Sequence, residues 1–223
     1  MMAGSETARH CRGRRWKTLC AATLLTSILA VPAAAKVKDW QITPTSAESL
    51  IVISAQSQTF SDQDLVFSRE GQSSYGGRYT LRIKAGDAAP FVARAVVPGT
   101  YRLNNFVQQR SWSSCFGNGT VAFTVQPGKV YYLGTPNIKS LLADLKQSVL
   151  ARGATRLRLS DNFIEWNPKV KPEFVTGAVE DLASVRTFVT TTMPMTTAPV
   201  ESLATVPTKF ASGTGKKILQ VCG

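Results

Sequence analysis

One pattern occurs twice between residues 91 and 134: an apolar, β-branched run reaches a Pro-Gly pair, and an aromatic-bearing run follows it. The pairs are Pro98-Gly99 and Pro127-Gly128. Proline sets φ at about −65° in the first turn position, and glycine supplies the positive φ that a type II turn needs in the second. Type II turns match the twist of a two-residue hairpin poorly. The second turn therefore either carries a bulge or passes between two sheets, and the repeated pattern predicts a small antiparallel β domain.

Two segments, residues 79–84 and 120–126, alternate between apolar and polar side chains, which is typical of half-buried strands. Residues 50–53 are continuously apolar and β-branched, which predicts a fully buried strand. Residues 64–70, 91–97 and 156–160 are further predicted strands, and residues 110–119 are a predicted loop. The inward-facing residues of the two alternating segments are Tyr79, Leu81, Ile83, Val121, Phe123 and Val125.

The hydrophobic period changes from two to that of an amphipathic helix in residues 138–152. Asn137 is a candidate N-cap, and Gly153 is a candidate residue just beyond the helix end. We therefore predict a mainly β fold: an antiparallel β-sandwich of the prealbumin or immunoglobulin type with one covering amphipathic helix. A short helix is predicted at residues 178–188. The apolar stripe of the covering helix consists of Ile138, Leu141, Leu142, Leu145 and Val149.

The first 35 residues have the three parts of a secretory signal peptide. A positive region contains Arg12, Arg14, Arg15 and Lys17, residues 19–31 are apolar, and residues 32–35 (PAAA) precede the expected cleavage site. The apolar run is shorter than the roughly 20 residues that a membrane-spanning helix needs. We expect a periplasmic or secreted protein with no transmembrane span after processing, exported by the general or the twin-arginine route. The predicted parts are a signal peptide (1–35), an entry segment (36–48), the sandwich (49–188) and a flexible Thr/Pro-rich extension (189–223) that ends in a docked strand.

The motifs PGTYRL and PGKVYYLG, about thirty positions apart, give the chain a family resemblance. It resembles an uncharacterised family of bacterial envelope and lipoprotein domains, which is itself similar to prealbumin-like β-sandwiches. The resemblance covers roughly residues 49–134, and it implies a fold and a compartment but no catalytic residues. This chain departs from the lipoprotein members because the residue directly after Ala35 is lysine and not the cysteine that would carry an acyl anchor.

The formal net charge is +12, and removal of the signal peptide would leave +8. In a cell envelope a basic protein is expected to meet anionic partners: lipid head groups, lipopolysaccharide phosphates or cell-wall carboxylates. Arg82, Lys84, Arg94 and Arg102 fall at outward positions of three successive predicted strands and are candidates for a basic, anion-binding stripe. An ordinary solvated face is the alternative. No nucleic-acid recognition motif is present.

Histidine and cysteine limit the chemistry further. The only histidine, His10, lies in the signal peptide, so the processed chain lacks Ser-His-Asp triads, Cys-His pairs and histidine metal ligands. Cys115 and Cys222 are the two cysteines that follow the signal peptide. In an oxidising compartment they predict a disulfide, with two free thiols or an intermolecular bridge as alternatives.

The remaining site candidates are weak. Asp62 and Asp64 supply too few oxygen ligands for a Ca²⁺ loop, and Asp161 with Glu165 is an acid pair of unknown separation. We therefore predict an exported, non-enzymatic binding or structural module with no cofactor and no metal. A carbohydrate-binding module and an acid-pair hydrolase are the alternatives. The aromatic residues considered for stacking on sugar rings are Trp40, Tyr75, Trp112 and Trp166.

Overall fold

The computed structural model describes residues 40–55, 61–72, 77–86, 89–108, 110–152, 162–166, 168–176 and 179–210. They all belong to one compact unit, Ala34–Gly223. The predicted signal peptide, the predicted strand at residues 156–160, Gly153, Asp161 and Cys222 lie outside the described residues. The strands are β1 (Ser49–Ser54), β2 (Gln63–Arg69), β3 (Arg78–Ile83), β4 (Phe91–Val96), β5 (Gly99–Gln108), β6 (Trp112–Cys115), β7 (Thr120–Val125), β8 (Val130–Pro136), β9 (Phe163–Glu165), β10 (Phe174–Val175), β11 (Val200–Ser202) and β12 (Val206–Thr208); the helices are α1 (Ile138–Ala151) and α2 (Val179–Thr192).

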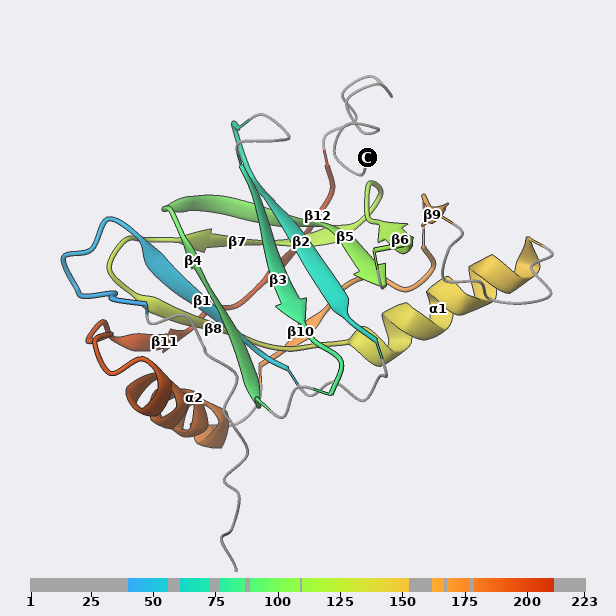
Figure 1. Ribbon diagram of the computed structural model, residues 1–223. Helices are drawn as coiled ribbons and strands as arrows, with labels where there is room; N and C mark the ends of the chain where they lie inside the picture. The colour runs from blue at the N-terminus through green and yellow to red at the C-terminus, as the bar shows by residue number, and fades with distance from the viewer. Residues whose placement is uncertain are drawn as a thin grey trace, which may run out of the picture. The chain divides into compact units, whose positions relative to one another are not determined.

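The strands form two sheets, and the fold is the predicted β-sandwich with helical additions (Figure 1). The five-stranded sheet has the order β10-β8-β1-β4, and β11 also pairs with β8. The seven-stranded sheet has the order β12-β7-β5-β2-β3, with β6 on β5 and β9 on β6. The sheets are mixed rather than purely antiparallel, because the pairs β1–β8, β11–β8 and β6–β9 are parallel.

Both Pro-Gly pairs carry the chain from one sheet to the other. Strand β4 lies in the five-stranded sheet and β5 in the seven-stranded sheet, while β7 and β8 make the reverse crossing. At the second crossing Gly128 has φ of 68°, and a Cβ there would lie 2.2 Å from the carbonyl oxygen of Pro44. At the first crossing the Tyr101 hydroxyl donates a hydrogen bond to the carbonyl of Val97. The turns are therefore arches between sheets, which for the second turn is one of the two alternatives that the sequence left open.

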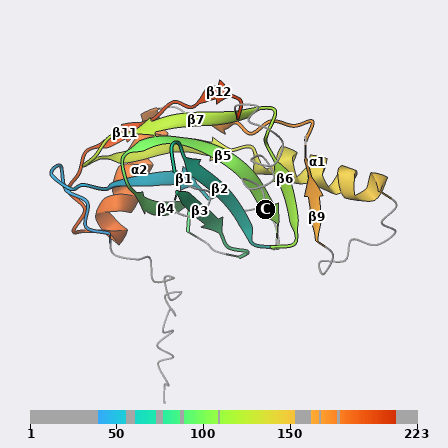
Figure 2. The ribbon, with the colours of Figure 1, turned by 90° about the horizontal axis from the view of Figure 1, so that it is seen from above.

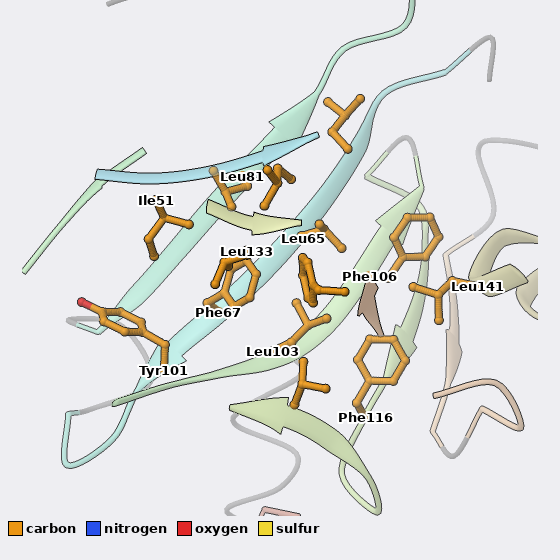
Figure 3. Packing of buried hydrophobic residues seen from close by; sticks show 14 of the residues in the cluster. Ile51, Leu65, Phe67, Leu81, Tyr101, Leu103, Phe106, Phe116, Leu133 and Leu141 are labelled. Carbon is orange, nitrogen blue, oxygen red and sulfur yellow. The ribbon is translucent and has the colours of Figure 1, made fainter. Parts of the chain in front are cut away.

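The main core lies between the two sheets, and the side chains that fill it converge from both (Figure 3). The ring of Tyr101 stacks on Phe123 with centroids 5.6 Å apart, and Phe67 meets Phe123 edge to face at 5.4 Å. The predicted alternation is confirmed in β3 and β7, because their inward residues lie in or against this core. Largest among its fully buried side chains are Tyr101, Phe67, Phe106, Phe116, Ile51, Ile53, Leu65, Ile83, Leu103, Leu133 and Leu141.

A second core lies on the other side of the five-stranded sheet, beneath α2 (Figure 2). Strand β1 is buried on both faces: Ile51 and Ile53 point into the main core, whereas Leu50 and Val52 point towards α2. This explains why residues 50–53 are continuously apolar. The residues that α2 contributes are Val185, Phe188 and Val189, with Leu182 packed against them.

Helix α1 matches the prediction and buries Leu141, Leu142, Leu145 and Val149 in the main core. It contacts β6 and β9 rather than covering the face of a sheet. The helix that covers a sheet face is α2. Asn137 makes no side-chain cap hydrogen bond. Its amide instead links the neighbouring segment, donating to the carbonyl of Lys171 and accepting from the N–H of Glu173, both at 3.0 Å.

Two predicted irregular segments are ordered by long-range pairing. Residues 112–115 form β6 on β5, with Trp112 and Phe116 in the main core, although the serines between them have low strand propensity. The predicted flexible extension begins inside α2, and its described part, up to Phe210, contains β11 and β12. These strands pair with β8 and β7, so the extension contributes to both sheets. Such partners are distant in sequence and leave no local signal.

Candidate functional site

The four residues of the predicted basic stripe do not form one surface. Arg82 on β3 donates two hydrogen bonds of 2.7 Å to the Asp64 carboxylate on β2, and these bonds raise the pKa of Arg82. Arg102 on β5 forms an ion pair with Glu70. Strand β2 separates β3 from β5, and β4, which carries Arg94, belongs to the other sheet.

The side chain of Arg94 does not point outwards, contrary to the sequence-based prediction. It is the direct partner of Ile51 in the β1–β4 pair, and cross-strand partners share a face. Arg94 therefore lies on the side of the main core, at the exposed edge of the five-stranded sheet. An inward-pointing charge on an edge strand opposes pairing with another chain. Lys84, just after β3, is exposed.

The other sequence candidates are also separated. Asp62 accepts a hydrogen bond from the N–H of Ala85, and both oxygens of Asp64 are held by Arg82. Trp112 is buried in the main core. Trp40 packs against the second core, and Trp166 follows β9. Tyr75 and Asp161 lie outside the described residues, and the described residues contain no cluster of three acids, histidines or cysteines that could hold a metal ion.

Cys115, the first half of the predicted disulfide, is completely buried at the end of β6. Its Cα partner on β5 is Asn105. Because Cys222 lies outside the described residues, the disulfide stays a prediction.

A groove of about 720 Å³ lies between α2 and the outer face of the five-stranded sheet. Its floor contains three aromatic rings from three different elements. Phe91, at the start of β4, lies 5.3 Å from Phe188 of α2 and 6.1 Å from Tyr132 of β8, measured between ring centroids. Phe91 is half-buried, so one part of this aromatic floor faces the groove.

One flank of α2 supplies hydroxyl groups to the same groove. Ser184, Thr187 and Thr191 follow the spacing i, i+3, i+7, which places them on one side of the helix. Ser54 and Thr135 add hydroxyls from the sheet. Thr190, one turn after Thr187 on the exposed side of α2, does not line the groove.

Asp181 is the only charged residue among the described residues that line this groove. Burial raises the pKa of the Tyr132 hydroxyl, its hydrogen bond with Thr135 acts in the opposite direction, and the negative charge of Asp181 adds to the rise. Tyr132 is therefore a neutral hydroxyl near neutral pH. Among the described residues that line it, the groove combines apolar ring faces, neutral hydroxyls and one carboxylate, with no lysine or arginine.

A second groove, of about 660 Å³, lies between β12 and the segment that leads into β10. It is lined by Lys171, Lys209 and Glu173, with backbone from Gly119. The Lys171 ammonium donates to the carbonyl of Pro168 at 2.9 Å. Its lining has only one aromatic residue, Phe174, so the groove under α2 is the better-formed binding site.

Sequence reasoning missed the aromatic groove because its residues come from positions 54, 91, 132 and 181–192. The one local signal is on α2, where Phe188 on the buried side is flanked by hydroxyl residues at helical spacing. Nothing local connects that helix to Phe91 or Tyr132.

Comparisons with models of known protein families, with characterised proteins and with solved structures returned no match. The resemblance to envelope and lipoprotein domains therefore remains a prediction from the two Pro-Gly motifs. In the part of the chain that the structure describes, neither helix is long and apolar enough to cross a lipid bilayer.

Proposed function

We propose that the protein is an exported, non-enzymatic binding module of the cell envelope that takes a neutral, hydroxylated ring ligand of the carbohydrate class. The site is the groove under α2. The observation that carries the proposal is the joint presence of an aromatic floor (Phe91, Tyr132, Phe188) and a hydroxyl flank (Ser184, Thr187, Thr191) in one groove.

The chemistry of the groove favours a sugar over an anion. The half-buried Phe91 ring, packed on the buried rings of Tyr132 and Phe188, offers an apolar surface to the C–H groups of a sugar ring. The hydroxyls donate and accept hydrogen bonds around the edge of the sugar, and the carboxylate accepts them. An anionic ligand would meet Asp181 with no opposing positive charge among the described residues of the lining. The volume of about 720 Å³ also lies within the usual range of small-ligand sites.

Binding rather than catalysis is proposed because catalysis needs an activated group. A glycosidase uses two carboxyl groups on either side of the scissile bond, whereas Asp181 is the one carboxylate among the described residues that line this groove. The chain's only histidine is at position 10. Export is supported by the charged region, apolar run and small residues of the first 35 positions.

Titration calorimetry of the exported, processed chain with a panel of neutral oligosaccharides (cello-, chito- and galacto-oligosaccharides) tests this function. We expect at least one series to bind, and Phe91→Ala to weaken its affinity about tenfold or more. Phe163→Ala is the matched control, because Phe163 is also half-buried but lies on β9, outside the groove. Absence of binding across the panel, or equal loss in both variants, would overturn the proposal.

A second pair of variants compares two exposed threonines of α2, of which one lines the groove and the other does not. Thr187 and Thr190 each donate a hydrogen bond to the carbonyl four residues earlier, at 3.0 Å, and both are exposed. Only Thr187 lines the groove. We expect Thr187→Val to weaken saccharide binding several-fold and Thr190→Val to leave it unchanged.

Association with anionic envelope components is the second candidate function. Its support is the net positive charge together with the exposed side chains of Lys84 and Arg94, for which the described residues show no ion pair. Sedimentation with phosphatidylglycerol vesicles should fall when both become glutamine and when salt is added, since charges are screened over about 8 Å at physiological ionic strength. The control is the double variant Lys139→Gln and Lys146→Gln, because both lysines are exposed on α1. Salt-insensitive association would exclude this role.

A further inference from the structure

The carboxylate of Asp181 gives the groove under α2 a preference that its rings and hydroxyls do not. Asp181 lies in the first turn of α2, is half-buried and is the one charged side chain among the described residues of the lining. In the part of the chain that the structure describes, no ion pair involves it. A partly buried carboxylate is stabilised by an opposite charge, because burial weakens its hydration. A ligand that brings a positive charge to this point therefore gains more than a neutral one.

Two hydroxyls of β8 extend the same polar end of the groove. Tyr132 and Thr135 both line it, and their side chains are hydrogen-bonded to each other. Burial raises the pKa of Tyr132 and the charge of Asp181 adds to the rise, which places the carboxylate within electrostatic reach of a neutral hydroxyl. A hydroxyl oxygen has two acceptor lone pairs and a carboxylate only accepts, whereas an ammonium group only donates, through three N–H bonds. The acceptors of this end match an ammonium group.

The aromatic floor favours the same charge. Phe91 is half-buried, and its ring centroid lies 5.3 Å from that of Phe188 and 6.1 Å from that of Tyr132. The faces of aromatic rings carry the negative part of the ring quadrupole, so they attract cations as well as C–H groups. Arg186, five residues after Asp181 on α2, does not line the groove. A positive group on a ligand would thus meet the carboxylate and the ring faces together.

We infer that the groove prefers a saccharide in which a ring carries a protonated amine, an amino sugar, and that Asp181 is the residue that selects it. The inference rests on the proposed function and narrows its ligand class. Neutral saccharides bind through the ring face and the hydroxyls alone, and the amine adds its contact with Asp181. Acetylation of the amine removes the positive charge and with it this contact. The positive charge of the rest of the chain opposes the preference only weakly, since it is screened over about 8 Å at physiological ionic strength.

Titration calorimetry with three kinds of trisaccharide of one β-1,4-linked backbone tests the preference. The ligands are cellotriose, chitotriose, and chitotriose from which one acetyl group has been removed, in each of its three positions. We expect at least one deacetylated form to bind about tenfold more tightly than the other two kinds, the usual effect of a hydrogen bond to a charged group. Asp181→Asn should abolish this preference and leave the affinity for cellotriose unchanged. Glu165→Gln is the matched control, because Glu165 is also a half-buried acid but lies on β9, outside the groove.

The outcomes separate this inference from the proposed function. If no trisaccharide binds, the proposed function fails and the inference fails with it. If all bind equally, or if the acetylated form binds best, the groove takes saccharides without selecting an amine, and the inference alone is overturned. An equal loss of preference in Glu165→Gln would overturn it too, because overall charge would then be the cause. Spermidine should bind much more weakly than the deacetylated trisaccharide, since it has no ring to pack on Phe91, and equal binding would show that the groove takes amines rather than amino sugars.

Discussion

The two outer faces of the sandwich are built differently. The five-stranded sheet carries an apolar outer face that α2 covers, leaving a groove with aromatic rings and hydroxyls at one side of the helix. The seven-stranded sheet carries a mixed outer face, which has paired charges such as Asp64 with Arg82 and also the buried residues Val66 and Ala122. The difference is visible in the strands: β1 is apolar at successive positions, whereas β7 alternates. The continuously apolar strand β1 lies under α2, and the face that α2 covers is the one with the candidate binding site.

The largest expected effect contrasts the same substitution on the two faces. Val52→Asp places an uncompensated charge under α2, where Val52 is fully buried, and we expect a loss of about 3–5 kcal/mol or more. That is a large part of the total stability of a typical domain, about 5–15 kcal/mol. Thr124→Asp, at an exposed position of β7, should change stability by only about 0.5 kcal/mol. Chemical denaturation of both variants measures the contrast, and similar losses would mean that the faces do not differ.

The arch between β7 and β8 determines which sheet each strand joins, so its glycine should be the next most sensitive position. Gly128→Ala combines a left-handed conformation with a Cβ 2.2 Å from the Pro44 carbonyl oxygen, and we expect a loss of about 3 kcal/mol. Gly86→Ala is the control, because Gly86 also has φ of 68° but has open space around it. It should lose only about 1 kcal/mol. Equal melting temperatures of the two variants would contradict the close approach at Gly128.

The other arch should make the protein sensitive to alkali. Burial raises the pKa of Tyr101 in the folded state, and its neighbour Tyr79 raises it further. Above the ordinary tyrosine pKa of about 10 the unfolded state then holds fewer protons than the folded state, so stability falls as pH rises. We expect the melting temperature to be flat with respect to this group below about pH 9 and to drop above about pH 10. Tyr101→Phe should reduce the drop, and an unchanged alkaline profile would contradict the burial of the hydroxyl.

The smallest expected effect belongs to the outer face of the seven-stranded sheet. Arg82 and Asp64 form a two-bond ion pair, but about a third of the Arg82 side chain is exposed (35%). Such a pair contributes about 1 kcal/mol or less. A double-mutant cycle with Arg82→Gln and Asp64→Asn should give a coupling energy of that size, decreasing with salt. A coupling energy of several kcal/mol would mean that water is excluded from the outer face of the seven-stranded sheet as it is from the core under α2.

Local patterns predicted the elements that have a buried side of their own. The alternation in β3 and β7, the continuous apolar run of β1 and the stripe of α1 each report burial along a single element. The partners of each strand were not predictable in the same way. Strands β11 and β12 are three residues each, rich in polar residues and proline, and exist through pairing with β8 and β7. The groove was not predicted either, because Phe91, Tyr132 and Phe188 meet only after the sheet and α2 have formed.

The most direct test of the binding face is NMR of the exported chain labelled with ¹³C in its phenylalanine and tyrosine rings, titrated with the oligosaccharide panel. Binding in the groove predicts shifts concentrated on Phe91, Tyr132 and Phe188, with Tyr79 and Phe163 unaffected, since neither lines the groove. Shifts centred on Tyr79 or Phe163, or no ring shifts with any oligosaccharide, would contradict the assignment of the helix-covered face as the binding face.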